Sequence, residues 1–282
     1  MPTAAVAPVF GRVAMIGKPS SPGIAASLRE LRAFLEKRGC KVLGDAAAAQ
    51  LAIVVGGDGT MLAAARELVR HHVPLVGVNQ GRVGFMTDIG QKDMLAGVGA
   101  ILDGEGSIEE RSLLDVEILR GGKSILRTIA LNEAVLGKGA QGRLIEFSLS
   151  LDGEFVYTLR ADGMIVATPT GSTAYAMSAQ GPILHPAVPA LALVPLNPHT
   201  LSARPVSVSD RSVIEIVLVR AMDARAHFDG FALADMAEND RMVLKRSADS
   251  VRFVHPPGYR YFATLREKLR WSEALVKNPE PD

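Results

Sequence analysis

An aspartate lies inside a glycine-rich turn in the segment LAIVVGGDGTMLAAARELV, which covers residues 51–69. An apolar run typical of a buried strand precedes the turn, and a helical pattern follows it. Turns of this kind bind phosphate, because the backbone N–H groups at a helix start attract anions. A carboxylate at Asp58 would repel a phosphate, so it either stabilises the turn or serves another chemical purpose. The residues expected to form the phosphate loop are Gly56, Gly57, Gly59 and Thr60, with Thr60 as the helix cap.

Two adjacent polar residues, Asn132 and Glu133, interrupt the apolar run ALNEAVLG at 130–137. Neighbours in a strand point to opposite faces, so at least one of them faces the core unless the strand ends there. Burying either side chain unpaired costs about 1–3 kcal/mol or more, and a polar ligand would remove that cost. Vicinal ribose hydroxyls would donate to Glu133, whereas Asn132 both donates and accepts. The alternative is a turn at the end of a strand.

The segment RADGMIVATPTGSTAYAMSAQGPILHP, residues 160–186, carries a second strand–loop–helix pattern. Asp162 precedes the strand-like run 164–167, and TPTGST then supplies a Gly/Pro turn with several hydroxyl groups. Tyr175 follows and is available to contact a base or another ring. The alternative, a simple capped helix, becomes less attractive beside the GGDGT turn and the Asn-Glu pair.

The elements that must position these residues fall into two groups. The N-terminal part alternates strand and helix patterns, which predicts parallel βαβ units in a Rossmann-like α/β domain over residues 1–107. Ligands of such sheets bind at the carboxyl ends of the strands, where Asp58 and Asn79 would both lie. The expected strands are 12–19, 51–55 and 73–79, and the expected helices are 24–39 and 61–72.

Residues 108–256 show runs that alternate with period two and are punctuated by glycine, which predicts a β-rich second domain. The C-terminal stretch 257–282 contains a helical pattern at 261–275 and is expected to pack back on the first domain.

The composition favours a cytoplasmic globular protein. The 282 residues are 48% hydrophobic, enough for two domains, and 31 Lys+Arg balance 30 Asp+Glu. This balance gives no electrostatic signature for nucleic acid or an anionic membrane. The single cysteine, Cys40, fits a reducing compartment, and we identify neither a signal peptide nor a membrane-length apolar run. The six histidines do not cluster at metal-ligand spacing, so no zinc or other protein-held metal is expected.

Taken together, these stretches resemble the NAD kinase family, which phosphorylates NAD to NADP with ATP. GGDGTML, LNEAVL, RADGMIVATPTGSTAYAMSAQGPIL and NPHTLSARPV occur in the family's order, and NQGRVGFMTD and YFATLREKLRW are also similar. The resemblance spans nearly the whole chain. GGDGT alone is less specific, because lipid kinases and phosphofructokinases carry related turns. The TPTGSTAY block beside the Asn-Glu pair is much more specific.

The resemblance implies that Asp58 accepts the proton of the adenosine ribose 2′-hydroxyl as that hydroxyl attacks the γ-phosphoryl group of ATP. It also implies that Mg²⁺ or another divalent cation arrives with ATP, that Asn132 and Glu133 bind ribose, and that Asp162 contacts the nicotinamide end. Asp229 matches an acid near the site in some members. Family members generally form dimers or tetramers through the β-rich domain, so we expect residues 108–256 to bind NAD and to form the oligomer contacts here as well. The expected NAD-binding residues are Asp58, Gly59, Asn132, Glu133, Arg143, Arg160, Asp162, Thr173, Ala174, Tyr175 and Ser178.

The chain departs from the family pattern at three positions. Ala161 replaces a common serine, a small change that we expect to be tolerated, and Phe231 replaces a residue that is polar in many members. Arg160 stands where some relatives have glycine, a difference that favours NAD over NADH. Two alternatives stay open: a lipid or sugar kinase that shares the GGDG turn, and a dinucleotide sensor that has lost catalysis. The sequence leaves open whether ATP or polyphosphate is the phosphoryl donor.

Overall fold

A computed structural model describes residues 9–81, 84–140 and 143–271. The chain divides into two compact units, one formed by residues 1–110 together with 251–282, the other by residues 111–250. Residues 1–8 and 272–282 lie outside the described part. Residues 1–8 are part of the stretch in which the sequence predicts no signal peptide. No helix in the described part is both long and apolar enough to cross a membrane.

The first unit is an α/β fold around a parallel sheet, as the sequence predicts. β1 pairs with β2 and β3, and β3 pairs with β4, all in parallel. β3 and β4 are buried along their whole length, which explains their continuous apolar sequences. The elements are β1 (Arg12–Gly17), α1 (Pro22–Lys37), β2 (Lys41–Leu43), β3 (Leu51–Val55), α2 (Asp58–Leu68), β4 (Leu75–Asn79), β5 (Ile89–Gly90), α3 (Met94–Leu102) and α5 (Tyr261–Leu269).

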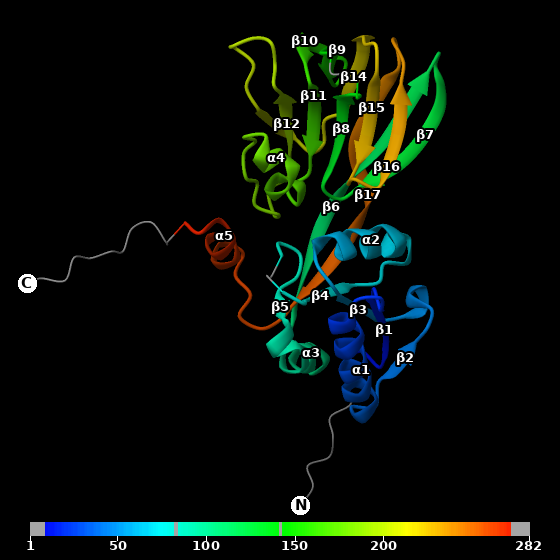
Figure 1. Cartoon of the computed structure of the whole chain (residues 1–282), viewed down its shortest axis with the longest axis vertical. Helices are drawn as coiled ribbons and strands as arrows, with labels where there is room; N and C mark the ends of the chain where they lie inside the picture. The colour runs from blue at the N-terminus through cyan, green and yellow to red at the C-terminus, as the bar shows by residue number, and fades with distance from the viewer. Residues whose placement is uncertain (1–8, 82–83, 141–142, 272–282) are drawn as a thin grey trace, which may run out of the picture. The chain divides into compact units, whose positions relative to one another are not determined.

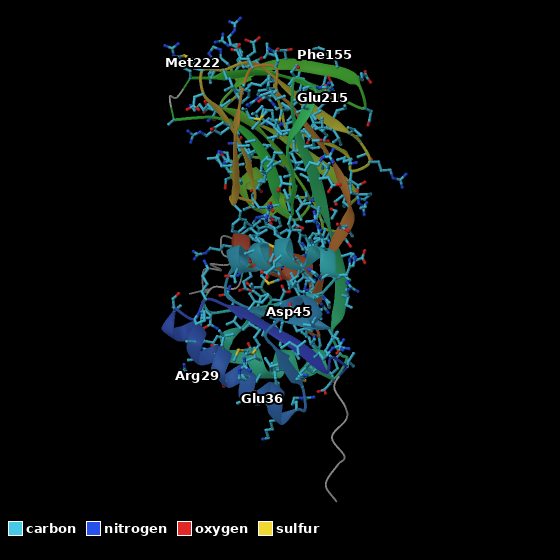
Figure 2. All side chains as sticks on the ribbon, turned by 90° about the vertical axis from the view of Figure 1, so that its right-hand side faces the viewer. Arg29, Glu36, Asp45, Phe155, Glu215 and Met222 are labelled. Carbon is cyan, nitrogen blue, oxygen red and sulfur yellow. The ribbon has the colours of Figure 1, made fainter. Side chains whose placement is uncertain are left out.

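The helices bury one stripe each against this sheet. In α1, Leu31 and Leu35 are fully buried, whereas Arg29 and Glu36 lie on the exposed side of the helix (Figure 2). Leu31 and Leu35 share a core with α3 and the strands, and α2 lies on the other side of the sheet (Figure 1). α2 begins at Asp58, earlier than the predicted start at residue 61. Asp58 is therefore the first residue of a helix, where the helix dipole favours a negative charge.

The second unit is β-rich, also as predicted, and consists of antiparallel sheets packed face to face. One sheet has the order β13-β12-β11-β8-β15-β16, and the other contains β10-β9-β14-β17 with the β6–β7 hairpin. A shared apolar core contains Phe147 and Phe228, which are fully buried. Its strands are β7 (Lys123–Ala130), β8 (Glu133–Lys138), β9 (Ile145–Leu151), β10 (Glu154–Ala161), β11 (Gly163–Ala167), β12 (Ala190–Leu196), β13 (Val206–Ser209), β14 (Ile214–Arg220), β15 (Ala224–Phe228), β16 (Ala232–Met236) and most of β6 (Ser107–Arg120) and β17 (Arg241–His255). The first residues of β6 and the last residues of β17 belong to the first unit.

The predicted helix after TPTGST is short. A 3₁₀ turn at Gly171–Thr173 leads into the four-residue helix α4 (Tyr175–Ser178). So short a helix has little macrodipole, so the second strand–loop–helix segment offers an anion less than the pattern suggests.

Candidate active site

The carboxylate of Asp58 is held by the backbone of a loop that follows β4. Its Oδ2 accepts a hydrogen bond from the N–H of Phe85 at 2.9 Å, and its Oδ1 accepts one from the N–H of Met86 at 3.0 Å. Asp58 is partly exposed, and each of its oxygens retains a lone pair for another donor. The side chain is thus oriented by the protein while it stays accessible to a ligand.

This loop approaches Asp58 so closely that only glycine fits beside the carboxylate. A Cβ added at Gly84 would lie 2.0 Å from Asp58 Oδ1, well inside any tolerable contact. The loop is braced by Asn79 and Thr87: Asn79 Nδ2 donates to Thr87 Oγ1 at 2.9 Å, and the N–H of Gly84 donates to the same oxygen at 2.8 Å. Asn79, expected at the ligand edge of the sheet, thus holds the loop that holds Asp58.

The predicted phosphate loop divides into two pairs. The N–H of Gly56 donates to the carbonyl of Val78 at 2.9 Å, and the N–H of Thr60 donates to the carbonyl of Gly57 at 2.9 Å. Both amides therefore already have backbone acceptors within the protein. Gly57 is the N-cap of α2, and Thr60, predicted as the cap, lies in the first turn instead. Gly57 and Gly59 are exposed and make the turn's outer edge, where an anion has access to the helix start.

The Asn132–Glu133 corner in the second unit depends on Asp229. Asp229 Oδ1 accepts hydrogen bonds from the N–H groups of Asn132 at 2.7 Å and Glu133 at 3.1 Å, and its Oδ2 accepts one from Leu131 at 2.8 Å. The corner also packs tightly on the TPTGST loop, because a Cβ at Gly171 would lie 2.1 Å from the carbonyl oxygen of Asn132. The backbone of the pair is therefore fixed from both sides.

The side chains of this pair keep buried acceptors. Asn132 and Glu133 are 6% and 8% exposed, and within the described residues neither Asn132 Oδ1 nor Glu133 Oε2 has a hydrogen-bond partner. Burial, together with the nearby charge of Asp229, raises the pKa of Glu133 to about 7. A buried acceptor without a hydrogen-bond donor lowers stability. A ligand with adjacent hydroxyl groups could donate to both Asn132 Oδ1 and Glu133 Oε2 and remove that cost.

A pocket of about 430 Å³ in the second unit joins Glu133 to Asp162. Asp162 Oδ1 lies 2.6 Å from Lys138 Nζ, and its Oδ2 accepts a hydrogen bond from Asn197 Nδ2 at 2.9 Å. Burial raises the pKa of Asp162, but the hydrogen bonds from Lys138 and Asn197 and the Lys138 charge outweigh burial and lower it on balance. Asp162 is therefore an ionised group at one end of the pocket.

The remaining predicted residues fall into different places. Tyr175 lines this pocket and a neighbouring pocket of about 670 Å³, which Ser178 also lines. Thr173 is buried in the 3₁₀ turn, and Ala174 is half-buried beside it. Arg143, before β9, and Arg160, on β10, are exposed, and neither belongs to the lining of the two pockets.

Sequence reasoning missed three polar side chains of the smaller pocket: Lys138, Asn197 and His227. Burial, and then the charge of Arg225, lowers the pKa of His227, so this ring is mainly neutral near pH 7. Lys138 reaches Asp162 because β8 and β11 pair with Gly137 opposite Gly163. Only the pairing of strands that are distant in the sequence brings these side chains together. Within the described residues, no group of three or more His, Cys, Asp or Glu side chains is arranged to bind a metal.

The architecture matches solved kinase structures over nearly the whole chain. A structure of yeast NADH kinase with NADH aligns over 96% of this chain and 90% of its own, with a TM-score of 0.87 and 23% identity. A structure of an NAD kinase from Archaeoglobus fulgidus with ATP aligns over 92% and 98%, with a TM-score of 0.76 and 25% identity. The chain therefore has the fold of the NAD(H) kinases.

Sequence comparison identifies the family. The ATP-NAD kinase N-terminal domain matches residues 36–105, and the ATP-NAD kinase C-terminal domain matches residues 131–256. An NAD kinase of Aromatoleum aromaticum is 54% identical over 93% of this chain and 95% of its own, and one of Azoarcus sp. is 52% identical over 93% and 97%. The chain belongs to the NAD kinase family, as the motifs in its sequence predict.

Proposed function

We propose that this chain transfers the γ-phosphoryl group of ATP to the 2′-hydroxyl of the adenosine ribose of NAD, giving NADP and ADP. The chain is an enzyme with NAD kinase activity, given relatives of that name that are 42–54% identical over most of its length. The observation that carries the residue-level proposal is the Asp58 carboxylate, fixed by the N–H groups of Phe85 and Met86 and still partly exposed.

In this proposal, Asp58 accepts the proton of the 2′-hydroxyl while the hydroxyl oxygen bonds to the γ-phosphorus and the bond to the ADP oxygen breaks. An alcohol is a weak nucleophile, and a carboxylate within hydrogen-bond reach removes its proton during attack. Two backbone donors prevent the carboxylate from rotating, so its remaining lone pairs point in fixed directions. Alignment of this kind supplies much of the rate enhancement in phosphoryl transfer.

We assign the phosphates of ATP to the start of α2. Exposed Gly57 and Gly59 let a phosphate approach the helix N-terminus, and Gly56 and Thr60 shape the turn through their own backbone hydrogen bonds. With the phosphates bound by this backbone, the negative charge of Asp58 remains available for the acceptor hydroxyl.

We expect a divalent cation, Mg²⁺ or a substitute, to enter with ATP. Because no metal-binding cluster is present among the described side chains, phosphate oxygens and waters would provide most of its ligands, as Mg²⁺ prefers. The Asp58 carboxylate lies within the phosphate loop and would supply one oxygen ligand to such a hydrated ion. When bound, the cation neutralises phosphate charge during transfer.

We assign NAD recognition to the second unit and to Asp58 with Gly59. Asn132 and Glu133 would accept hydrogen bonds from the ribose hydroxyls through their buried oxygens. Asp162 would contact the nicotinamide end from within the pocket. The surrounding nucleotide contacts would come from Arg143, Arg160, Thr173, Ala174, Tyr175 and Ser178, and Arg160 would favour NAD over NADH.

We also propose a homodimer or homotetramer formed through the β-rich unit, and a cytoplasmic location. Large apolar side chains are exposed on this unit, including Phe155 and Met222 (Figure 2) and Leu233 on β16. Exposed apolar side chains on a strand offer surface for association with a second copy. Sedimentation velocity of the purified protein would measure the assembly directly.

The test is to incubate the purified protein with NAD, ATP and Mg²⁺ and to follow NADP with an NADP-specific dehydrogenase. Parallel reactions would replace ATP with polyphosphate, NAD with NADH, and Mg²⁺ with a chelator. NADP formation that requires ATP and the cation supports the proposal. Phosphorylation of a diacylglycerol or a sugar without NADP would favour the other kinases with a GGDG turn. Tight NAD binding without product would favour the sensor.

A further inference from the structure

A buried histidine in the first unit bridges two carboxylates on different segments. His255, at the end of β17, is 3% exposed. Its Nδ1 lies 2.6 Å from Asp88 Oδ2, and its Nε2 lies 2.8 Å from Glu109 Oε2. Its ring also stacks on Tyr259, with centroids 3.8 Å apart and planes within 6°. The imidazole is therefore held in one place on three sides.

The two ring contacts define the state of the histidine. Carboxylate oxygens only accept, so a ring that bonds to both must donate from both nitrogens, which makes it an imidazolium. Burial alone lowers the pKa of His255, but Asp88 and Glu109, by hydrogen bonds and charge, outweigh burial and raise it. The bridge is thus an ionic link in which one cation holds two anions that would otherwise repel each other.

Asp88 connects this bridge to the loop that holds the Asp58 carboxylate. It directly follows Thr87, which braces the loop through Asn79 and Gly84. The N–H groups of Phe85 and Met86, which hold the Asp58 carboxylate, lie three and two residues before Asp88, respectively. On the other side, Ile89 pairs with Val78 of β4. The segment 84–88 is consequently anchored to the sheet at residue 89 and to His255 at residue 88.

We infer that His255 is a positioning residue for phosphoryl transfer: through Asp88 it fixes the loop whose backbone N–H groups orient the Asp58 carboxylate. The inference rests on the proposed function, because it matters for catalysis only if Asp58 acts on the substrate hydroxyl. Misplacing a reacting group by about 1 Å can cost on the order of a hundredfold in rate. A small shift of the loop is therefore enough to produce a measurable loss.

The test combines kinetics with amide hydrogen exchange on the full chain. His255→Gln removes the imidazolium but keeps a polar side chain, and Asp88→Asn keeps the shape of its partner while removing its charge. Both variants should lower kcat by about ten- to a hundredfold with little change in KM for NAD. Both should also lose exchange protection at the amides of Phe85 and Met86, while the core strands β1 and β3 keep theirs.

Arg38→Gln is the matched control, because it breaks another ion pair of the first unit, with Asp103, away from this loop. It should lower stability without changing kcat or the exchange at residues 85 and 86. If both bridge variants lower only the melting temperature, or lower kcat without faster exchange at those amides, the inference is overturned. Should Asp58→Asn itself retain full turnover, the proposed role of Asp58 fails instead, and the two failures are distinguishable.

Discussion

Two carboxylates in this molecule hold the same kind of backbone groups, yet their surroundings differ. In the first unit, Asp58 accepts the N–H groups of two residues, one on each oxygen, and stays partly exposed. In the second unit, Asp229 accepts three consecutive N–H groups and is 7% exposed. The first arrangement leaves a carboxylate oriented but available, whereas the second consumes most of its capacity in holding the chain.

The local backbone explains the difference. Asp58 opens a helix after a buried parallel strand, so its side chain stands at the edge where a ligand can arrive. Asp229 lies in the tight turn between β15 and β16, with φ of 52°, and Gly230 follows with φ of 71°. Two successive left-handed residues are typical of an Asp-Gly hairpin turn, which aims the Asp229 carboxylate back at residues 131–133. The same kind of backbone contact therefore orients the proposed proton acceptor in one unit and holds a chain corner in the other.

The largest effect should come from removing the structural carboxylate. Asp229→Ala leaves three N–H groups at residues 131–133 without their acceptor, so the unfolding free energy should fall by at least about 3 kcal/mol. NAD affinity should fall as well, because the corner that carries Asn132 and Glu133 loosens. Urea denaturation and calorimetric titration with NAD measure the two effects.

Asp235→Ala, in the same hairpin but exposed, is the control and should change stability by less than about 1 kcal/mol. Equal stability of the two variants would break the comparison.

A smaller effect, confined to catalysis, should follow from crowding Asp58. The Cβ of Gly84→Ala would lie 2.0 Å from Asp58 Oδ1, so the carboxylate or the loop must move. We expect kcat to fall by about ten- to a hundredfold with NAD affinity retained. Steady-state kinetics would show this, with Gly44→Ala as the control, because nothing described lies within 4 Å of its added Cβ. Normal turnover in Gly84→Ala would show that the position of Asp58 is not critical.

The smallest effect depends on pH and concerns Glu133. Its pKa is raised to about 7 by burial and by Asp229, so the side chain gains a proton as the pH falls below 7. If the carboxylate accepts hydrogen bonds from the ribose hydroxyls, as proposed, KM for NAD should rise about tenfold between pH 8 and pH 6. Glu133→Gln, which does not titrate, should give a KM that is flat over this range. A wild-type KM that is equally flat would remove Glu133 from the pH-dependent step.

The raised pKa of Glu133 also makes the unfolding free energy depend on pH. Because the folded-state pKa of Glu133 lies above the ordinary value of 4.5, the folded protein holds the proton more tightly than the unfolded chain. The stabilisation from this proton is complete below pH 4.5 and is lost as the pH rises through about 7. Glu133→Gln should therefore flatten the unfolding free energy across this interval relative to the wild type.

The architecture was readable from the sequence because its signals are local. The apolar run LAIVV and the helical spacing after GGDGT predict β3 and α2, and the period-two segments predict the β-rich unit. The start of α2 was predicted three residues late, since Gly-Asp-Gly is a poor helix sequence and the Gly57 cap gives no side-chain signal.

The contacts among the site residues could not be predicted from the sequence in the same way. The contact of Asp58 with the Phe85 and Met86 amides joins positions 27 and 28 residues apart. Lys138 meets Asp162 only because β8 pairs with β11. The chemical types were visible in the motifs, but which backbone amide or lysine each carboxylate would meet depends on tertiary pairing.

The most direct test of the account compares turnover and NAD binding in Asp58→Asn. If Asp58 is an oriented proton acceptor, kcat should fall by about a hundred- to ten-thousandfold, while the calorimetric dissociation constant for NAD and the unfolding free energy change little. A variant that turns over at nearly the wild-type rate would contradict the proton-acceptor role. A variant that loses NAD binding or stability in proportion to its activity would show that Asp58, like Asp229, mainly holds the structure.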